Sequence, residues 1–136
     1  MSGWSHELVF APEPESASKV RDFVAEHLVA HGLAHLVEDA QLVGNELATN
    51  ALVHAQTAFT VTLTSMDGVV LLVIRDGSGS LPVRSSPRAT DVGGRGLVLV
   101  EMLSHEWGAS RDDSGSKSVW ASFATHVDPG PARTWT

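Results

Sequence analysis

The most informative segment of the chain reads Glu46-Leu47-Ala48-Thr49-Asn50-Ala51. The apolar pattern around this segment predicts a helix from about residue 34 to residue 54. Side chains four residues apart share one helix face, so Glu46 and Asn50 should lie side by side. A carboxylate can accept a proton or orient a hydroxyl, and a carboxamide oxygen is a hard donor that Mg²⁺ accepts. Alone, such a pair is typical of ordinary helix surface, and it becomes a candidate site only through the segments that follow.

Three later segments add glycines, hydroxyls and a second carboxylate. They read Ile74-Arg75-Asp76-Gly77-Ser78-Gly79, then Gly93-Gly94-Arg95-Gly96-Leu97, then Ser116-Lys117-Ser118-Val119-Trp120. The order and spacing of the four segments resemble the GHKL ATPases. Within that family, the resemblance is to the anti-sigma-factor serine/threonine kinases and related actinobacterial regulatory proteins. It covers about residues 5 to 125.

The resemblance implies a site for ATP and Mg²⁺. Asn50 would ligate the metal ion, and Glu46 would orient and deprotonate the attacking hydroxyl group. Asp76 would bind the amino group of adenine, with the small hydroxyl residue Ser118 beside it. Ser78 belongs to the Asp76 segment, where the family has the pattern Asp-x-Gly-x-Gly and this chain has serine at both glycine positions.

The glycine-rich run is typical of a phosphate-binding segment in front of a helix. Glycines let backbone amides approach phosphate oxygens, and the helix dipole favours the negative charge. The resemblance matches Gly94 and Gly96 to the glycines of an ATP lid. Arg95 between them could add positive charge, and Leu97 would begin the helix. We expect residues 77–93, rich in Gly, Ser and Pro, to form a mobile lid.

The remaining pattern predicts an α+β fold, a two-layer sandwich with helices on one face of a mixed, mostly antiparallel sheet. We expect Leu42 on the second helix, and Trp120 on the last strand, to lie in the core. The domain should span residues 1–127, followed by a disordered tail at 128–136. The expected elements are strands at 5–10, 59–65, 69–76, 106–110 and 117–123, and helices at 16–31 (capped by Ser16), 34–54 and 97–103.

Composition excludes several classes of protein. The chain of 136 residues has no cysteine, so disulfides, thiolate metal sites and cysteine nucleophiles are ruled out. A net charge of -7 argues against direct binding of nucleic acid, because phosphates demand a basic surface. No apolar run approaches the ~20 residues of a membrane span. We therefore expect a soluble, cytoplasmic protein.

Three histidines, His27, His31 and His35, recur at helical spacing. They would form a metal-binding face only on a continuous helix, which Gly32 is expected to interrupt. We therefore expect solvated helix surface here.

The resemblance implies that the protein phosphorylates an anti-anti-sigma (STAS-type) partner and holds a sigma factor inactive. A homodimer is compatible with it. The alternative is a non-catalytic ATP-binding or pseudokinase module that acts only by binding a partner. A third hypothesis, the catalytic fragment of a histidine kinase, is less favoured, because we expect no dimerising histidine helix within this length.

Overall fold

The computed structural model describes residues 3–77, 92–111 and 115–125, and for residues 54 and 92–97 it describes the backbone alone. Of the expected lid, residues 77–93, residues 78–91 lie outside this part of the chain, and so do the expected tail residues 128–136. The elements are β1 (Trp4–Phe10), α1 (Glu15–Ala30), η1 (Ala34–Leu36), α2 (Val37–Asn50), η2 (Ala51–Ala55), β2 (Phe59–Met66), β3 (Val69–Asp76), α3 (Val92–Leu103), β4 (Glu106–Arg111) and β5 (Lys117–Ala124).

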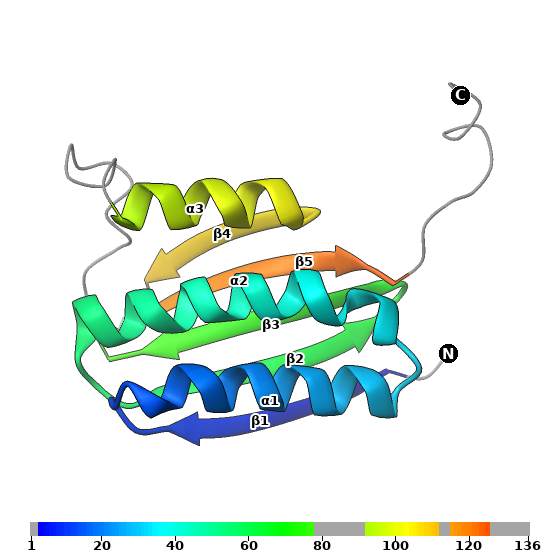
Figure 1. The fold of residues 1–136 in the computed structure, drawn as a ribbon, viewed down its shortest axis with the longest axis horizontal. Coiled ribbons are helices and arrows are strands. Elements are labelled where there is room, and N and C mark those ends of the chain that lie inside the picture. Colours follow the sequence, from blue (N-terminus) through cyan, green and yellow to red (C-terminus); the bar gives the residue numbers. More distant parts are fainter. Residues whose placement is uncertain (1–2, 78–91, 112–114, 126–136) are drawn as a thin grey trace.

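The five strands form one sheet in the order β1-β2-β3-β5-β4. Each described pair of neighbouring strands is antiparallel. The helices α1, α2 and α3 lie together on one face of this sheet, so the molecule has two layers (Figure 1). The predicted α+β two-layer sandwich is confirmed, with a sheet that is antiparallel throughout its described strands.

The alternating sequence of β2 explains which face the helices cover. Phe59, Val61 and Leu63 are buried beneath the helices, and the threonines between them lie on the opposite face. The hairpin to β3 turns at Asp67 and Gly68, which have φ of 56° and 80°. Positive φ at both positions is what a type I′ hairpin turn requires, and an Asp-Gly pair between two strands favours this turn.

Two expectations for the helices were wrong in detail. Ser16 does not cap α1, because it lies inside the first turn, where its hydroxyl donates to the carbonyl oxygen of Ala11 at 2.7 Å. Leu42 is 43% exposed and not part of the core. Val43 and Leu47 of the same helix are buried, and Leu42 is rotated about 100° away from Val43 around the helix axis.

Trp120 lies on the face of the sheet that carries no helices. Its neighbours in β5, Val119 and Ala121, are buried on the helix side, so Trp120 points the other way. It pairs with Gly108 of β4, and a Cβ atom on Gly108 would lie 2.6 Å from the indole ring. The expectation that Trp120 lies in the core is therefore wrong.

Candidate functional site

Four elements of the candidate site reach the same end of the sheet (Figure 1). The chain leaves α2 and β3 at this end, and it enters α3 and β5 there. The fold therefore gathers Asn50, Asp76, the glycine-rich run and the start of β5 in one region, although long stretches of sequence separate them. Glu46 lies one helical turn before Asn50 on α2.

Glu46 and Asn50 occupy the last part of α2, and both are half-buried. The helix continues past Asn50 as a π-helical turn, Ala51–Ala55, and ends at Gln56 with a φ of 58°. Such π turns often occur at functional sites, because the wider turn changes the direction of the side chains. Another amide on this helix, Asn45, has a different role: its oxygen accepts a hydrogen bond from Arg21 Nη1 at 2.6 Å.

Asp76 ends β3 and is buried, with 4% of its surface exposed. Directly opposite it stands Lys117, the first residue of β5, which is also buried. The ammonium nitrogen of Lys117 lies 3.5 Å from Asp76 Oδ2. The carboxylate is therefore held by a cation of the protein itself, a contact that the sequence did not reveal.

This register also corrects the expected position of Ser118. Ser118 pairs with Arg75, so the two side chains lie on the open face of the sheet, opposite to Asp76. The residue beside Asp76 is Lys117. A one-residue shift in a strand moves every side chain to the other face, and the sequence alone gave no register for β5.

A second contact that sequence reasoning missed joins β3 to the end of the helical segment. The backbone N–H of Gly77 donates to Thr57 Oγ1 at 3.1 Å. Thr57 lies between Gln56 and the start of β2, where no pattern in the sequence marks it. The contact fixes the chain immediately after Asp76 next to the residues that follow α2.

The glycine-rich run lies within α3 and not in front of it, because this helix begins at Val92 and not at Leu97. Gly93 and Gly94 fall in the first turn, where backbone N–H groups have no partner within the helix. Gly96 is the fifth residue, where the amide ordinarily bonds to the carbonyl four residues earlier. The structure does not describe the side chains of Arg95 and Leu97, and Ser78 lies outside the described residues.

His6, His27 and His31 cluster near the opposite end of the molecule. His6 Nε2 lies 3.0 Å from His31 Nε2, and the His6 ring stacks on His27 with centroids 3.8 Å apart. Burial first, and then the charge of His6, lower the pKa of His27 below its ordinary value. His35 instead contacts the carbonyl oxygen of Thr125 at 2.7 Å. Within the described residues, no group of three or more His, Asp or Glu could hold a metal ion.

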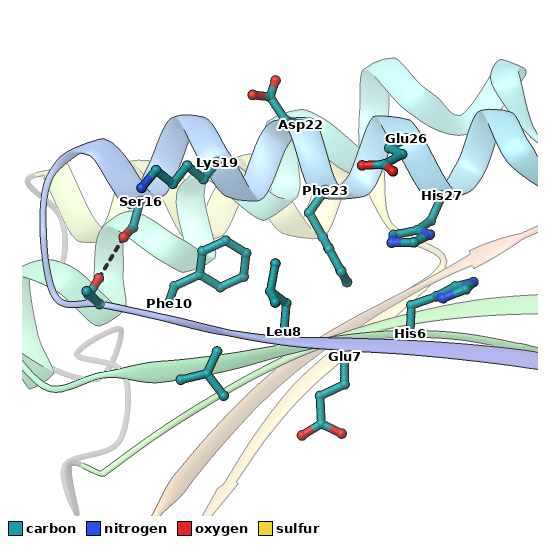
Figure 2. A pocket seen from close by; sticks show the side chains of 12 residues that line it. His6, Glu7, Leu8, Phe10, Ser16, Lys19, Asp22, Phe23, Glu26 and His27 are labelled. Atoms are coloured by element: carbon teal, nitrogen blue, oxygen red, sulfur yellow. Dashed lines mark hydrogen bonds between the residues drawn. The ribbon is translucent and has the colours of Figure 1, made fainter.

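Two cavities are lined by described residues, and the second lies next to the π turn that follows Asn50. One, of about 560 Å³, lies between β1 and α1, and Figure 2 shows Phe10 and Phe23 among the side chains that line it. The other, of about 650 Å³, lies beside Thr49 and Val53. As far as the described part of the chain goes, neither Asp76 nor Glu46 lines either cavity.

Comparison with known proteins identifies the class. The model of the histidine kinase-like ATPase domain family matches residues 10–123, so the chain belongs to that family. Its fold is that of the GHKL ATPases. The family match supports ATP as the ligand. No curated protein sequence matches the chain.

A solved structure with the same fold contains the RsbU and RsbW domains of Rv1364c from Mycobacterium tuberculosis. The TM-score is 0.68 and the sequence identity 18%. The match covers 89% of this chain but only 32% of that one. In the described residues, no helix is long and apolar enough to cross a membrane.

Proposed function

We propose that this protein is an ATP-dependent serine/threonine kinase of the anti-sigma type. The observation that supports this best is the meeting of α2, β3 and the start of α3 at one end of the sheet (Figure 1). This arrangement offers a carboxylate and an amide from one helix, a buried carboxylate from the sheet, and amide N–H groups from a second helix. These are the groups needed to bind a base and a polyphosphate next to an acceptor hydroxyl.

Glu46 is the proposed general base. It accepts the proton of the acceptor hydroxyl as that oxygen attacks the γ-phosphorus, and the bond from phosphorus to the β-phosphate oxygen breaks. The amides of Gly94 and Gly96 are proposed to hold the phosphates. Gly94 lies in the first turn of α3, and Gly96 would contribute only if this turn opens. Asp76 accepts a hydrogen bond from the adenine amine.

Asn50 fits a role as ligand of Mg²⁺. It offers a neutral carbonyl oxygen, a hard donor, and stands half-buried where α2 passes into its π turn. When bound, the ion neutralises phosphate charge. Its preference for retaining several waters suits a site to which the protein adds a single amide oxygen.

The acceptor is proposed to be a serine or threonine of an anti-anti-sigma (STAS-type) protein, and the same domain is proposed to hold a sigma factor. The support is the shared fold with a structure that contains RsbU and RsbW domains. A homodimer and a cytoplasmic location are further parts of this proposal.

A non-catalytic binding module is the second candidate, and one observation favours it. Asp76 is buried against Lys117, and the family's two glycines after the aspartate are replaced by serines in this chain. A closed adenine pocket would leave only protein–protein contacts. In that case Glu46 would have no proton to accept.

Calorimetric titration with ATP, with and without Mg²⁺, separates these two functions when combined with a transfer assay. We expect binding that depends on Mg²⁺, and transfer of labelled phosphate from ATP to a serine of a STAS-type protein from the same genome. ATP binding without transfer to any such protein supports the binding module. Absence of ATP binding contradicts the kinase and is the result expected of a binding module whose adenine pocket is closed.

A further inference from the structure

Lys117 is a buried charged group that the proposed mechanism leaves without a function. It is the first residue of β5 and stands opposite Asp76, the last residue of β3. Its side chain is 3% exposed and that of Asp76 is 1% exposed. Lysine is almost never buried to this extent unless its charge is paired, and the 3.5 Å contact with Asp76 Oδ2 supplies that pairing.

Stability alone is a weak reason for such a pair. Replacing a buried ion pair by apolar residues is often neutral or stabilising, because desolvation cancels the attraction of the charges. The preceding inward-facing residue of β3 is Ile74 and the next one of β5 is Val119, so an apolar pair would suit this layer. The pair also lies at the strand ends that face the candidate nucleotide site, and not in the middle of the core.

The hydrogen-bonding capacity of the Lys117 ammonium exceeds its single contact with Asp76. A lysine ammonium has three N–H donors, and a carboxylate can accept about four hydrogen bonds. Together they present an acceptor and a donor 3.5 Å apart. Adenine has the complementary arrangement on its pairing edge, where the exocyclic amine donates and the adjacent ring nitrogen N1 accepts.

We propose that Lys117 is a base-recognition residue, which donates to N1 of adenine while Asp76 accepts from the exocyclic amine. This inference rests on the proposed function and extends it, because it adds a second group that selects the nucleotide. A guanine in the same orientation would place a carbonyl oxygen against Asp76 and an N–H against the ammonium. Both contacts are repulsive, so the pair selects an adenine nucleotide against a 6-oxopurine nucleotide.

The test compares ATP with 1-deaza-ATP, in which N1 is replaced by C–H. A lost hydrogen bond to a charged group should weaken binding of 1-deaza-ATP to the wild type roughly 10- to 100-fold. Lys117→Met removes the donor but keeps an unbranched chain, and it should bind the two nucleotides within about 2-fold of each other. Lys117→Gln keeps a neutral donor and should give an intermediate ratio. The matched control is Lys19→Met, an exposed lysine of α1, which should retain the wild-type ratio.

The ratio within each protein is the deciding quantity, because a general loss of affinity cancels in it. If Lys117→Met does not fold, Lys117→Gln decides: a ratio equal to that of the wild type overturns the role of Lys117. Equal binding of both nucleotides to the wild type overturns it as well, and so does full discrimination by Lys117→Met. If the wild type binds no ATP at all, the proposed function fails together with this inference. ATP binding without discrimination refutes only the inference.

Discussion

Lys117 Nζ lies 3.5 Å from Asp76 Oδ2 across the β3–β5 pair, and both side chains are buried. A carboxylate that only binds a ligand could be changed to an amide with little effect on stability. Here the change Asp76→Asn leaves a buried ammonium without its anion. We expect a loss of roughly 3–5 kcal/mol in the free energy of unfolding, as for other broken buried pairs.

Urea unfolding measures this loss. Asp22→Asn, at an exposed position on α1, should stay within about 0.5 kcal/mol of the wild type. The double variant Asp76→Asn/Lys117→Met should recover part of the stability, because no unpaired charge remains. A wild-type unfolding midpoint for Asp76→Asn would show that the pair contributes nothing.

Asn50→Ala should abolish the dependence of ATP binding on Mg²⁺, because it removes the carbonyl oxygen proposed to ligate the ion. Calorimetric titrations with and without Mg²⁺ provide the measurement. Asn45→Ala is the matched control, since Asn45 lies on the same helix and its oxygen is bonded to Arg21. If Asn50→Ala binds ATP in Mg²⁺ as tightly as the wild type, Asn50 is not the metal ligand.

Gly108→Ala should destabilise the protein by roughly 1–3 kcal/mol, because the added Cβ atom would lie 2.6 Å from the ring of Trp120 and force it aside. Gly44→Ala on α2 should have the opposite sign. There the Cβ would meet its neighbours at 3.6 Å, an ordinary contact, and alanine favours the helix by up to about 1 kcal/mol. Thermal unfolding of both variants measures the two effects. A Gly108→Ala variant with wild-type stability would mean that the Trp120 ring does not lie against β4.

The histidine cluster should make stability depend on pH. Burial, then the charges of His6 and His31, lower the pKa of His27 below its ordinary value of 6.5, while Glu26 opposes the shift. The unfolded chain therefore binds more protons than the folded one just below pH 6.5, so stability falls as the pH is lowered through this range. Well above pH 6.5 His27 is neutral in both states and contributes no pH dependence.

Unfolding midpoints from pH 7.5 down to pH 5 measure this effect. His27→Gln should reduce the slope of stability against pH. His105→Gln, at an exposed position outside the cluster, should leave the slope unchanged. An unchanged slope in His27→Gln would assign the pH dependence to other groups.

Local features of the structure could be predicted from the sequence, and contacts between distant strands could not. Alternation in β2, the Asp67–Gly68 turn and the four-residue spacing of Glu46 and Asn50 depend on neighbouring residues alone. The position of Lys117 beside Asp76 depends on the register of two strands that are far apart in the sequence. Successive side chains of a strand point to opposite faces of the sheet. Without the register, the position beside Asp76 was assigned to Ser118, whereas the structure has Lys117 there.

The low helix propensity of glycine also led to a wrong prediction for the start of α3, which begins at Val92 and not at Leu97. Three glycines in four positions predicted an irregular segment, since glycine costs about 1 kcal/mol in a helix. In the structure Gly93, Gly94 and Gly96 are helical, and the helix that they begin packs on α2. Tertiary contacts outweigh the intrinsic preference here, and the sequence alone does not show these contacts.

The central claim is that Glu46 is the base of a phosphoryl transfer, and the variant Glu46→Gln tests it most directly. We measure the rate of transfer from labelled ATP to a STAS-type partner, with ATP affinity determined in parallel. Glu46→Gln should retain ATP affinity within a few-fold and lose roughly 10²–10⁴-fold in rate, the usual contribution of a positioned general base. Glu38→Gln, at an exposed position in the first turn of the same helix, should transfer at the wild-type rate. Equal rates for Glu46→Gln and the wild type would contradict the mechanism.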